Sequence, residues 1–251
     1  MSPAVFMERN VMRENLLLAS LPAREKERLE PFLESVEMPD GMVLIHPEEP
    51  IENIYFPETC VTSTLQELSD GSTVEAGLMG VEGMVGIQVW LREQQTPSKT
   101  LIQVSGRAQQ MSADDFKREV MGTNSPLNDF VARYTHAFLV MTSQVAACNR
   151  LHEVEPRLCR WLKMIHNRVD RDEFELRHDF IAQMLGVHRP TVSIAAKVLQ
   201  KAGLIDYSRG RMRILDPEGL KNGACECYTL IEGVVARLYS PVLLAQEDVK
   251  T

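Results

Sequence analysis

Long apolar runs are absent from this sequence of 251 residues. None approaches the roughly 20 residues that a membrane-spanning helix needs, so the sequence predicts no membrane partner. The first ten residues also lack the apolar core of a signal peptide, since Glu8 and Arg9 stand where that core would lie. A cytoplasmic protein is therefore expected.

Cysteines are too few and too scattered for a disulfide framework. The chain has five, and only Cys225 and Cys227 form a close pair. Buried thiols are the simplest interpretation. The alternative is that this pair, with His178 or His188 nearby, binds a metal or senses oxidation. The sequence alone assigns no metal ligand.

Histidines are scarce where a metalloenzyme would need them. A jelly-roll oxygenase or isomerase uses two or three histidines and a carboxylate on neighbouring strands. Residues 36–111 contain one histidine, His46. The other histidines, including His152, are expected at the surface or at helix ends. We therefore predict no catalytic residue and no enzyme.

Positive charge is in deficit overall, with 27 lysines and arginines against 35 acids and a net charge of −8. Residues 177–213 reverse this balance. They hold two acids, Asp179 and Asp206, against seven basic residues: Arg177, Arg189, Lys197, Lys201, Arg209, Arg211 and Arg213. DNA affinity depends on the local surface that faces the phosphates, and an acidic body repels DNA elsewhere. This distribution favours one DNA-binding module.

Residues from about 36 to 111 have the pattern of a compact antiparallel β domain. Short apolar or alternating runs are separated by frequent glycine turns, as in a sandwich or barrel. Asp70-Gly71, between two alternating runs, is the strongest hairpin signal. Short helices are expected before this domain, and Ser112 suits the cap of a helix after it.

The segment 126–152 has the most regular apolar pattern in the chain. Its spacing alternates between four and three, which is a heptad seam held for three repeats. The seam residues are Leu127, Val131, Tyr134, Phe138, Met141, Val145 and Cys148. We predict a long helix that pairs with its copy in a homodimer while its other flank covers the β domain. The alternative is a helix that packs on the β domain alone. A second helix is expected over 156–169, and then an acidic run, 170–173.

Residues 178–202 have the features of a helix-turn-helix. Gly186 stands at the expected turn, where a positive φ is cheap for glycine, and Pro190 suits the first turn of the second helix. The residues expected to face inward are Ile181, Ala182 and Leu185 from the first helix, and Val192, Ala195, Ala196 and Leu199 from the second.

The opposite face of the second helix and the hairpin that follows form the predicted DNA contact. Gly203 ends the helix, and Arg209-Gly210-Arg211 forms the tip of a basic wing that would contact phosphates or a minor groove. The predicted DNA-binding residues are Arg189, Thr191, Ser193, Ile194, Lys197, Lys201, Arg209 and Arg211. A winged helix used only for protein contacts is the alternative.

The run LRHDFIAQMLGVHRPTVSIAAKVLQKAGLIDYSRGRMRILD, after a glycine-punctuated β domain and a long helix, resembles the Crp/Fnr family of transcription regulators. The resemblance extends over nearly the whole chain and is most specific at 177–216. It implies an α+β fold with an N-terminal antiparallel β-roll or jelly roll, a long central dimerisation helix and a C-terminal winged helix-turn-helix. The expected domains are a cyclic-nucleotide-binding-like sensor (1–125), the dimerisation helix (126–152), the winged helix-turn-helix (153–223) and a C-terminal extension (224–251).

The resemblance also implies a homodimer that binds a near-palindromic operator in double-stranded DNA, with RNA polymerase as a candidate further partner. Arg189 and Ser193 match base-reading positions of the family. Pro190 and Ile194 depart from its usual residues, and Ile194 could touch a thymine methyl. The operator is therefore expected to differ from the best-known ones.

The effector pocket that the resemblance implies is formed by Gly86, Ile87, Gln88, Ser98 and Lys99. Ile87 replaces the ribose-binding glutamate of cyclic-nucleotide binders, and no arginine precedes Ser98. A buried cyclic phosphate would lack its bidentate partner, so cyclic AMP binding is not expected. An iron–sulfur cluster is not expected either, because the first cysteine is Cys60. The effector stays unknown.

Two other functions remain open. One is a redox- or metal-responsive regulator of the same family that uses its cysteines. The other is a dimeric sensor module that never contacts DNA, although such a module has no need of Arg209 and Arg211 on a hairpin tip.

Overall fold

The computed structural model describes residues 14–169 and 171–247, with side chains up to residue 239. The expectations for the first ten residues lie outside the described residues, and so does Asp170 of the expected acidic run. In the described part of the chain, no helix is long and apolar enough to cross a bilayer.

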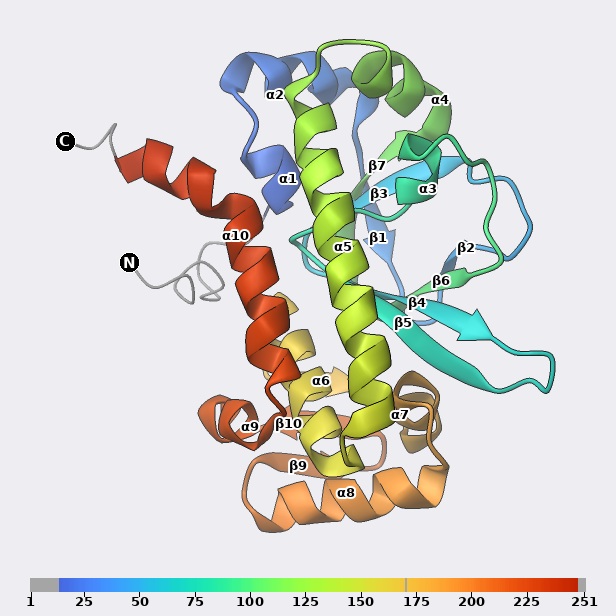
Figure 1. Cartoon of the computed structure of the whole chain (residues 1–251), viewed down its shortest axis with the longest axis vertical. Coiled ribbons are helices and arrows are strands. Elements are labelled where there is room, and N and C mark those ends of the chain that lie inside the picture. Colours follow the sequence, from blue (N-terminus) through green and yellow to red (C-terminus); the bar gives the residue numbers. More distant parts are fainter. Residues whose placement is uncertain (1–13, 170, 248–251) are drawn as a thin grey trace.

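The N-terminal part is the antiparallel β-roll that the sequence predicts (Figure 1). One sheet has the strand order β1-β7-β3 and the other β2-β6-β4-β5. The strands are β1 (Glu34–Met38), β2 (Val43–Ile45), β3 (Asn53–Pro57), β4 (Val61–Glu67), β5 (Thr73–Met79), β6 (Lys99–Val104) and β7 (Gly106–Ser112), with α3 (Ile87–Trp90) between β5 and β6.

The predicted hairpin at Asp70-Gly71 joins β4 to β5. Gly71 has a φ of +81°, which glycine adopts without a Cβ penalty. The Asp70 carboxylate accepts hydrogen bonds from the amide and the hydroxyl of Ser72. This local hydrogen bonding is typical of an aspartate in a turn.

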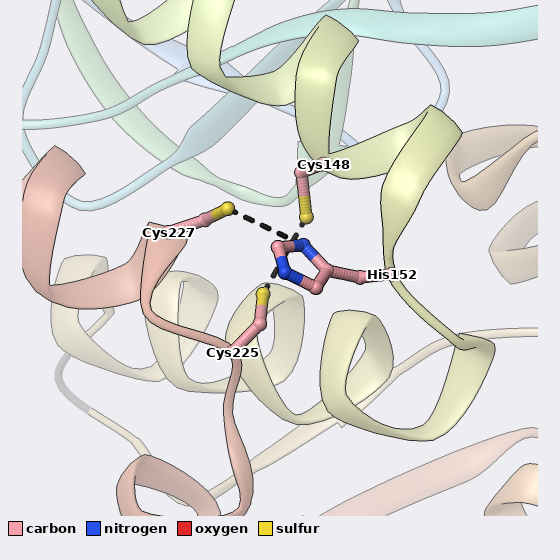
Figure 2. Close-up of side chains that lie close together, drawn as sticks. All are labelled: Cys148, His152, Cys225 and Cys227. Atoms are coloured by element: carbon pink, nitrogen blue, oxygen red, sulfur yellow. Dashed lines mark hydrogen bonds between the residues drawn. The ribbon is translucent and has the colours of Figure 1, made fainter.

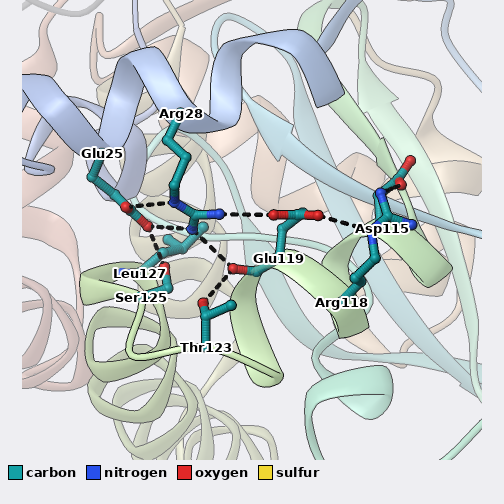
Figure 3. A network of polar contacts seen from close by, with 8 residues as sticks. All are labelled: Glu25, Arg28, Asp115, Arg118, Glu119, Thr123, Ser125 and Leu127. Carbon is teal, nitrogen blue, oxygen red and sulfur yellow. Dashed lines mark hydrogen bonds and ion pairs between the residues drawn. The ribbon is translucent and has the colours of Figure 1, made fainter.

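Short helical segments surround the β-roll: α1 (Leu16–Ala19), α2 (Ala23–Leu29) and η2 (Glu30–Phe32) before it, and α4 (Ala113–Phe116) and η3 (Lys117–Met121) after it. Arg28 of α2 links these two groups (Figure 3). Its guanidinium donates to both carboxylate oxygens of Glu25 and to the carboxylate and carbonyl of Glu119. Glu25 also accepts a hydrogen bond from Ser125, the N-cap of the long helix. The start of that helix is thereby fixed to α2.

Helix α5 (Pro126–Leu151) is the long helix that the heptad pattern predicts. The seven seam residues, however, pack within the chain: six are buried and Phe138 is half-buried. A Cβ on Gly83 would clash with the Tyr134 ring, and one on Gly77 would lie 2.7 Å from the Phe138 ring. The pattern therefore records burial against the β-roll and the C-terminal helix, and the prediction that these side chains meet a second copy is wrong.

The C-terminal half begins with α6 (Val154–Arg168) and continues through β8 (Glu173–Glu175), α7 (His178–Leu185), α8 (Arg189–Lys201), β9 (Ile205–Ser208), β10 (Arg211–Ile214) and α9 (Pro217–Gly223) to α10 (Cys227–Glu247). Helix α9 packs on α6, and α10 runs beside α5 (Figure 1). The C-terminal extension is therefore a helix that covers one flank of α5, which the sequence did not predict.

A buried ion network joins the β-roll, α6 and α10. Arg168, at the end of α6, is fully buried and donates from Nε to Glu82 Oε1 at 2.8 Å. Its Nη1 lies 3.6 Å from Glu232 Oε1 on α10. Asn167 donates to the other oxygen of Glu232 and to the Tyr228 hydroxyl. Burial raises the pKa of Glu232, and the charge of Arg168 opposes that rise.

We predict that Arg168→Met lowers the free energy of unfolding by about 3–5 kcal/mol, because it leaves Glu82 and Glu232 buried without their cation. Urea unfolding measures this loss. Arg24→Met on the exposed surface of α2 is the control and should change stability by less than about 0.5 kcal/mol. Equal stability of the two variants would contradict the role given to Arg168.

Candidate nucleic-acid interface

Helices α7 and α8 form the predicted helix-turn-helix. Gly186 ends α7 with a φ of +59°, and Pro190 lies in the first turn of α8. All seven residues expected to face inward are buried: Ile181, Ala182, Leu185, Val192, Ala195, Ala196 and Leu199. Because these small and branched side chains fill the contact between the two helices, the opposite face of α8 is left to solvent.

The outer face of α8 presents most of the predicted DNA-binding residues. Those that are exposed are Arg189, Thr191, Ile194, Lys197 and Lys201. Ile194 keeps 62% of its surface, and Val198, which the sequence did not single out, keeps 48%. Arg189 Nε lies 3.4 Å from Asp179 Oδ1 in an exposed ion pair. This face therefore combines cations with two apolar side chains that can meet thymine methyl groups.

Ser193 differs from its prediction as a base-reading residue. It is half-buried, and its hydroxyl lies 2.9 Å from His178 Nδ1 and 3.2 Å from the Arg189 carbonyl. The His178 ring in turn stacks on Tyr207 of the wing, with 4.3 Å between ring centroids. Ser193 thus ties α8 to α7 and to the wing, which makes it a positioning residue in this arrangement.

The wing is a three-stranded sheet in the order β8-β10-β9. Arg209 and Gly210 have φ values of +50° and +83° at its tip, and Arg209 and Arg211 are exposed there, as the sequence predicts. Strand β8 begins at Glu173, the last residue of the expected acidic run. Its Glu173 forms an ion pair with Arg213 at 2.7 Å and with Arg211 at 3.7 Å. This contact with Arg213 lowers the pKa of Glu173.

The helix-turn-helix docks on the β-roll through the β4–β5 hairpin. A Cβ on Gly186 would lie 3.0 Å from Val74 Cγ2, so the turn and the hairpin are in close contact. A cavity of about 680 Å³ lies beside this contact and is lined by residues of both parts, among them Leu68, Val187 and Thr191. Arg157 of α6 donates to the Leu185 carbonyl at the end of α7. The position of α8 therefore depends on the hairpin and on α6.

The residues of the expected effector pocket lie in two segments. Gly86 starts α3 with a φ of +98°, and Ile87 beside it is buried. Ser98 and Lys99 lie at the start of β6, where Ser98 donates to Gln66 of β4. Gly86 packs beside Ile54 of β3, whereas Ser98 contacts β4. No described contact joins the two segments, and the binding of an effector between them stays a prediction.

Cys225 and Cys227 lie near Cys148 and His152, and this corrects the expected pairing with His178 or His188 (Figure 2). His178 is engaged with Ser193 and Tyr207 instead. One signal in the sequence could have found the pair at the end of α5. Cys148 and His152 are four positions apart, which places them on one face of a helix.

Comparisons with known proteins agree with this geometry. Residues 156–222 match the Crp-like helix-turn-helix domain. FixK2 from Bradyrhizobium japonicum superposes with a TM-score of 0.64 at 14% identity, over 77% of this chain and 98% of FixK2. TTHB099, a CRP-family transcriptional regulator from Thermus thermophilus, gives 0.59 at 18% identity, over 76% and 96% of the two chains. No curated protein sequence matches the chain.

A third solved structure is CLP from Xanthomonas campestris, a c-di-GMP responsive global regulator, with a TM-score of 0.57 at 15% identity over 77% of this chain and 99% of CLP. The chain therefore has the fold of the Crp/Fnr transcription regulators together with their type of helix-turn-helix domain.

We predict that Gly186→Ala destabilises the protein more than Gly203→Ala does. Both glycines have a positive φ, so each substitution should cost about 1–2 kcal/mol of backbone strain. A Cβ at Gly203 meets no atom within 4 Å, whereas one at Gly186 presses on Val74. Urea unfolding measures both variants. Equal losses would show that the contact with the hairpin contributes nothing to stability.

Proposed function

We propose that this protein binds a near-palindromic DNA operator as a homodimer and regulates transcription through it. The observation that supports the proposal is the exposed outer face of α8, with Arg189, Lys197 and Lys201 beside the basic wing tip. A helix of this kind enters a major groove, while wing arginines contact phosphates. In a chain of net charge −8, this face concentrates the positive charge.

The dimer contact that we propose is the solvent-exposed face of α5. Its large apolar residues are Leu139, Val140 and Leu151, which are 59%, 37% and 74% exposed. Ala146 and Ala147 are exposed on the same helix, and small residues allow two helices to approach closely. The β-roll and α10 cover the other flanks. Two copies joined through this face would present two recognition helices, which gives the operator its two half-sites.

The β-roll is proposed to sense an effector other than a cyclic mononucleotide. Ile87 is buried where a ribose-binding glutamate would be needed, and Ser98 is already bonded to Gln66. CLP, whose fold is similar, responds to c-di-GMP. That property belongs to CLP, and this chain is not assigned the same ligand.

The DNA contact is tested on an operator selected from genomic DNA with the purified protein and analysed for a palindromic motif. Arg189→Ala should cost about 1–3 kcal/mol on this operator and relax preference at one base pair in each half-site. Arg209→Ala should weaken operator and scrambled duplexes about equally and shallow the salt dependence by about one phosphate contact per subunit. Fluorescence anisotropy at several salt concentrations measures both effects.

Two results would change this assignment. If Arg189→Ala weakened both duplexes by the same factor, Arg189 would be a phosphate contact and specificity would lie with Ile194, Val198 or DNA shape. If the wild-type protein bound no DNA at low salt, the module would serve protein contacts only.

The dimer is tested with the double substitution Leu139→Glu and Val140→Glu. Four carboxylates would then face one another in an apolar contact, so the variant should sediment as a monomer. Leu230→Glu is the matched control, since Leu230 on α10 is 51% exposed and lies outside the proposed contact. A variant that stays dimeric, or a wild type that is monomeric at micromolar concentration, would contradict the proposed dimer face.

Cyclic AMP should produce no binding heat in isothermal titration calorimetry at millimolar ligand, because no arginine stands before Ser98 to neutralise its phosphate. Cyclic GMP is expected to behave in the same way. Micromolar binding of either nucleotide would show that the β-roll has a phosphate site formed by other residues.

A further inference from the structure

Four potential metal ligands converge where α5 ends and α10 begins (Figure 2). Cys148 lies in the last turn of α5 and His152 follows its end, while Cys225 and Cys227 flank the start of α10. One sulfur or ring nitrogen from each of the four lies within 4.8 Å of the others. Cys148 Sγ is 3.5 Å from Cys225 Sγ, and Cys227 Sγ is 3.5 Å from His152 Nδ1.

The two separations of 3.5 Å match the edges of a tetrahedral thiolate site, and the 4.8 Å limit on the others is about 1 Å longer than such an edge. Zinc bonds of about 2.3 Å to sulfur and about 2.1 Å to nitrogen place neighbouring ligand atoms about 3.5–3.8 Å apart. Three cysteines and one histidine are also an ordinary ligand set for structural zinc. The four side chains need small movements to enclose an ion.

The histidine is already oriented for such a role. His152 Nε2 lies 3.2 Å from the Glu226 carboxylate, and Nδ1 faces the thiols. A ligating histidine usually gives its other N–H to a carboxylate, which fixes the ring and makes the ligating nitrogen more basic. Gln144 of α5 also donates to Cys227 Sγ at 3.1 Å. Polar side chains outside the ligand set therefore hold two of the four ligands.

The charge around the cluster fits an anionic centre. Zinc with three thiolates and a neutral histidine has a net charge of −1. The guanidiniums of Arg157 and Arg160, both buried, lie close enough to interact electrostatically with Cys148. Within the described residues, no ion pair within 4.0 Å involves Arg157 or Arg160; the buried Glu75 is near enough to interact electrostatically with Arg160, and no such carboxylate is found for Arg157. A buried cation without a carboxylate is costly unless another anion compensates it.

Ordinary buried thiols do not group in this way. Cys148, Cys225 and Cys227 form a small cluster of their own, separate from the main hydrophobic core. Cys60 and Cys159 are also buried and lie apart from it, and burial raises their pKa values to about 12 and about 11. Cys60 and Cys159 are therefore isolated buried thiols, with pKa values raised by burial.

We propose that Cys148, His152, Cys225 and Cys227 bind one thiophilic divalent metal ion, Zn²⁺, in a tetrahedral site. His152 lies in the short connection between α5 and α6, so the ion would fix the bend at which the helix-turn-helix half joins α5. The cysteines at the start of α10 would attach the C-terminal helix to the same point. The site is independent of the proposed DNA contact.

The proposal is tested on the full-length protein after chelation and reduction, with Co²⁺ and then Zn²⁺ as probes. Titration with Co²⁺ should saturate at one ion per chain, with the sulfur-to-metal charge-transfer and intense d–d absorption of tetrahedral thiolate cobalt. Zn²⁺ should displace it and raise the melting temperature. This readout does not involve DNA, so its failure leaves the proposed function untouched.

Variants separate the ligands from their surroundings. Cys227→Ser and His152→Asn should abolish the tetrahedral cobalt spectrum and the zinc-dependent rise in melting temperature. Glu226→Ala, on an exposed side chain, should weaken cobalt binding at least about tenfold without loss of fold. Cys159→Ser is the matched control, a buried thiol outside the cluster, and should bind like the wild type.

Three results would overturn the proposal. The reduced wild type could bind no Co²⁺, or the variants His152→Asn and Cys227→Ser could keep the full spectrum. The third result is that the purified protein contains a Cys148–Cys225 disulfide and binds no metal ion after this disulfide is reduced. That outcome would make the cluster a redox pair.

Discussion

The buried guanidinium of Arg168 is the constraint on which the relation between the two halves depends. Its partners, Glu82 and Glu232, come from the β-roll and from α10, so one cation holds three separate segments of chain. Removing any segment would leave a buried charge uncompensated, at a cost comparable with a large part of the stability of a domain. Its carbon chain also packs against Gly80, where a Cβ would lie 2.9 Å away. The β-roll, α6 and α10 are therefore expected to move as one body, so a shift of the helix-turn-helix relative to the β-roll must take place beyond the end of α6.

Helix α6 has this central position because its buried arginines contact different parts of the molecule. Arg168 contacts the β-roll and α10, and Arg157 donates to the carbonyl of Leu185 at the end of α7. The β4–β5 hairpin supports the helix-turn-helix from the other side through Val74. Two contacts therefore join α8 to the rest of the chain, and an effector that bound the β-roll as proposed would act on α8 through the hairpin or through α6. One contact is the packing of Val74 on the turn at Gly186, and the other is the hydrogen bond from Arg157 to the Leu185 carbonyl.

Sequence reasoning succeeded where the determining contacts are local. The inward stripe of α8, the positive φ of Gly186 and the basic wing tip all follow from residues a few positions apart. The heptad of α5 was real, but a period identifies a buried face and does not identify what covers it. Here the cover is the β-roll and the C-terminal helix α10, whose Glu232 pairs with Arg168, 64 positions earlier in the chain. The cluster of Cys148 with Cys225 was hidden for the same reason, since 77 residues separate them and only folding brings them together.

The acids beside the proposed DNA-facing surface form exposed ion pairs that a phosphate could replace. Glu173 lies beside both Arg211 and Arg213, and Asp179 lies beside Arg189, each in an ion pair exposed to solvent. Exposed pairs of this kind contribute little to stability because water and salt screen them. A phosphate has the same charge and better geometry for a guanidinium, so it can take over the arginine without a large cost to the fold. Without DNA, each carboxylate stays paired with its arginine and lowers the positive charge of this surface, which weakens the attraction of nonspecific polyanions. In the proposed contact, an operator therefore competes with Glu173 and Asp179 for these arginines, and a polyanion that places no phosphate at them gains less from displacing the acids.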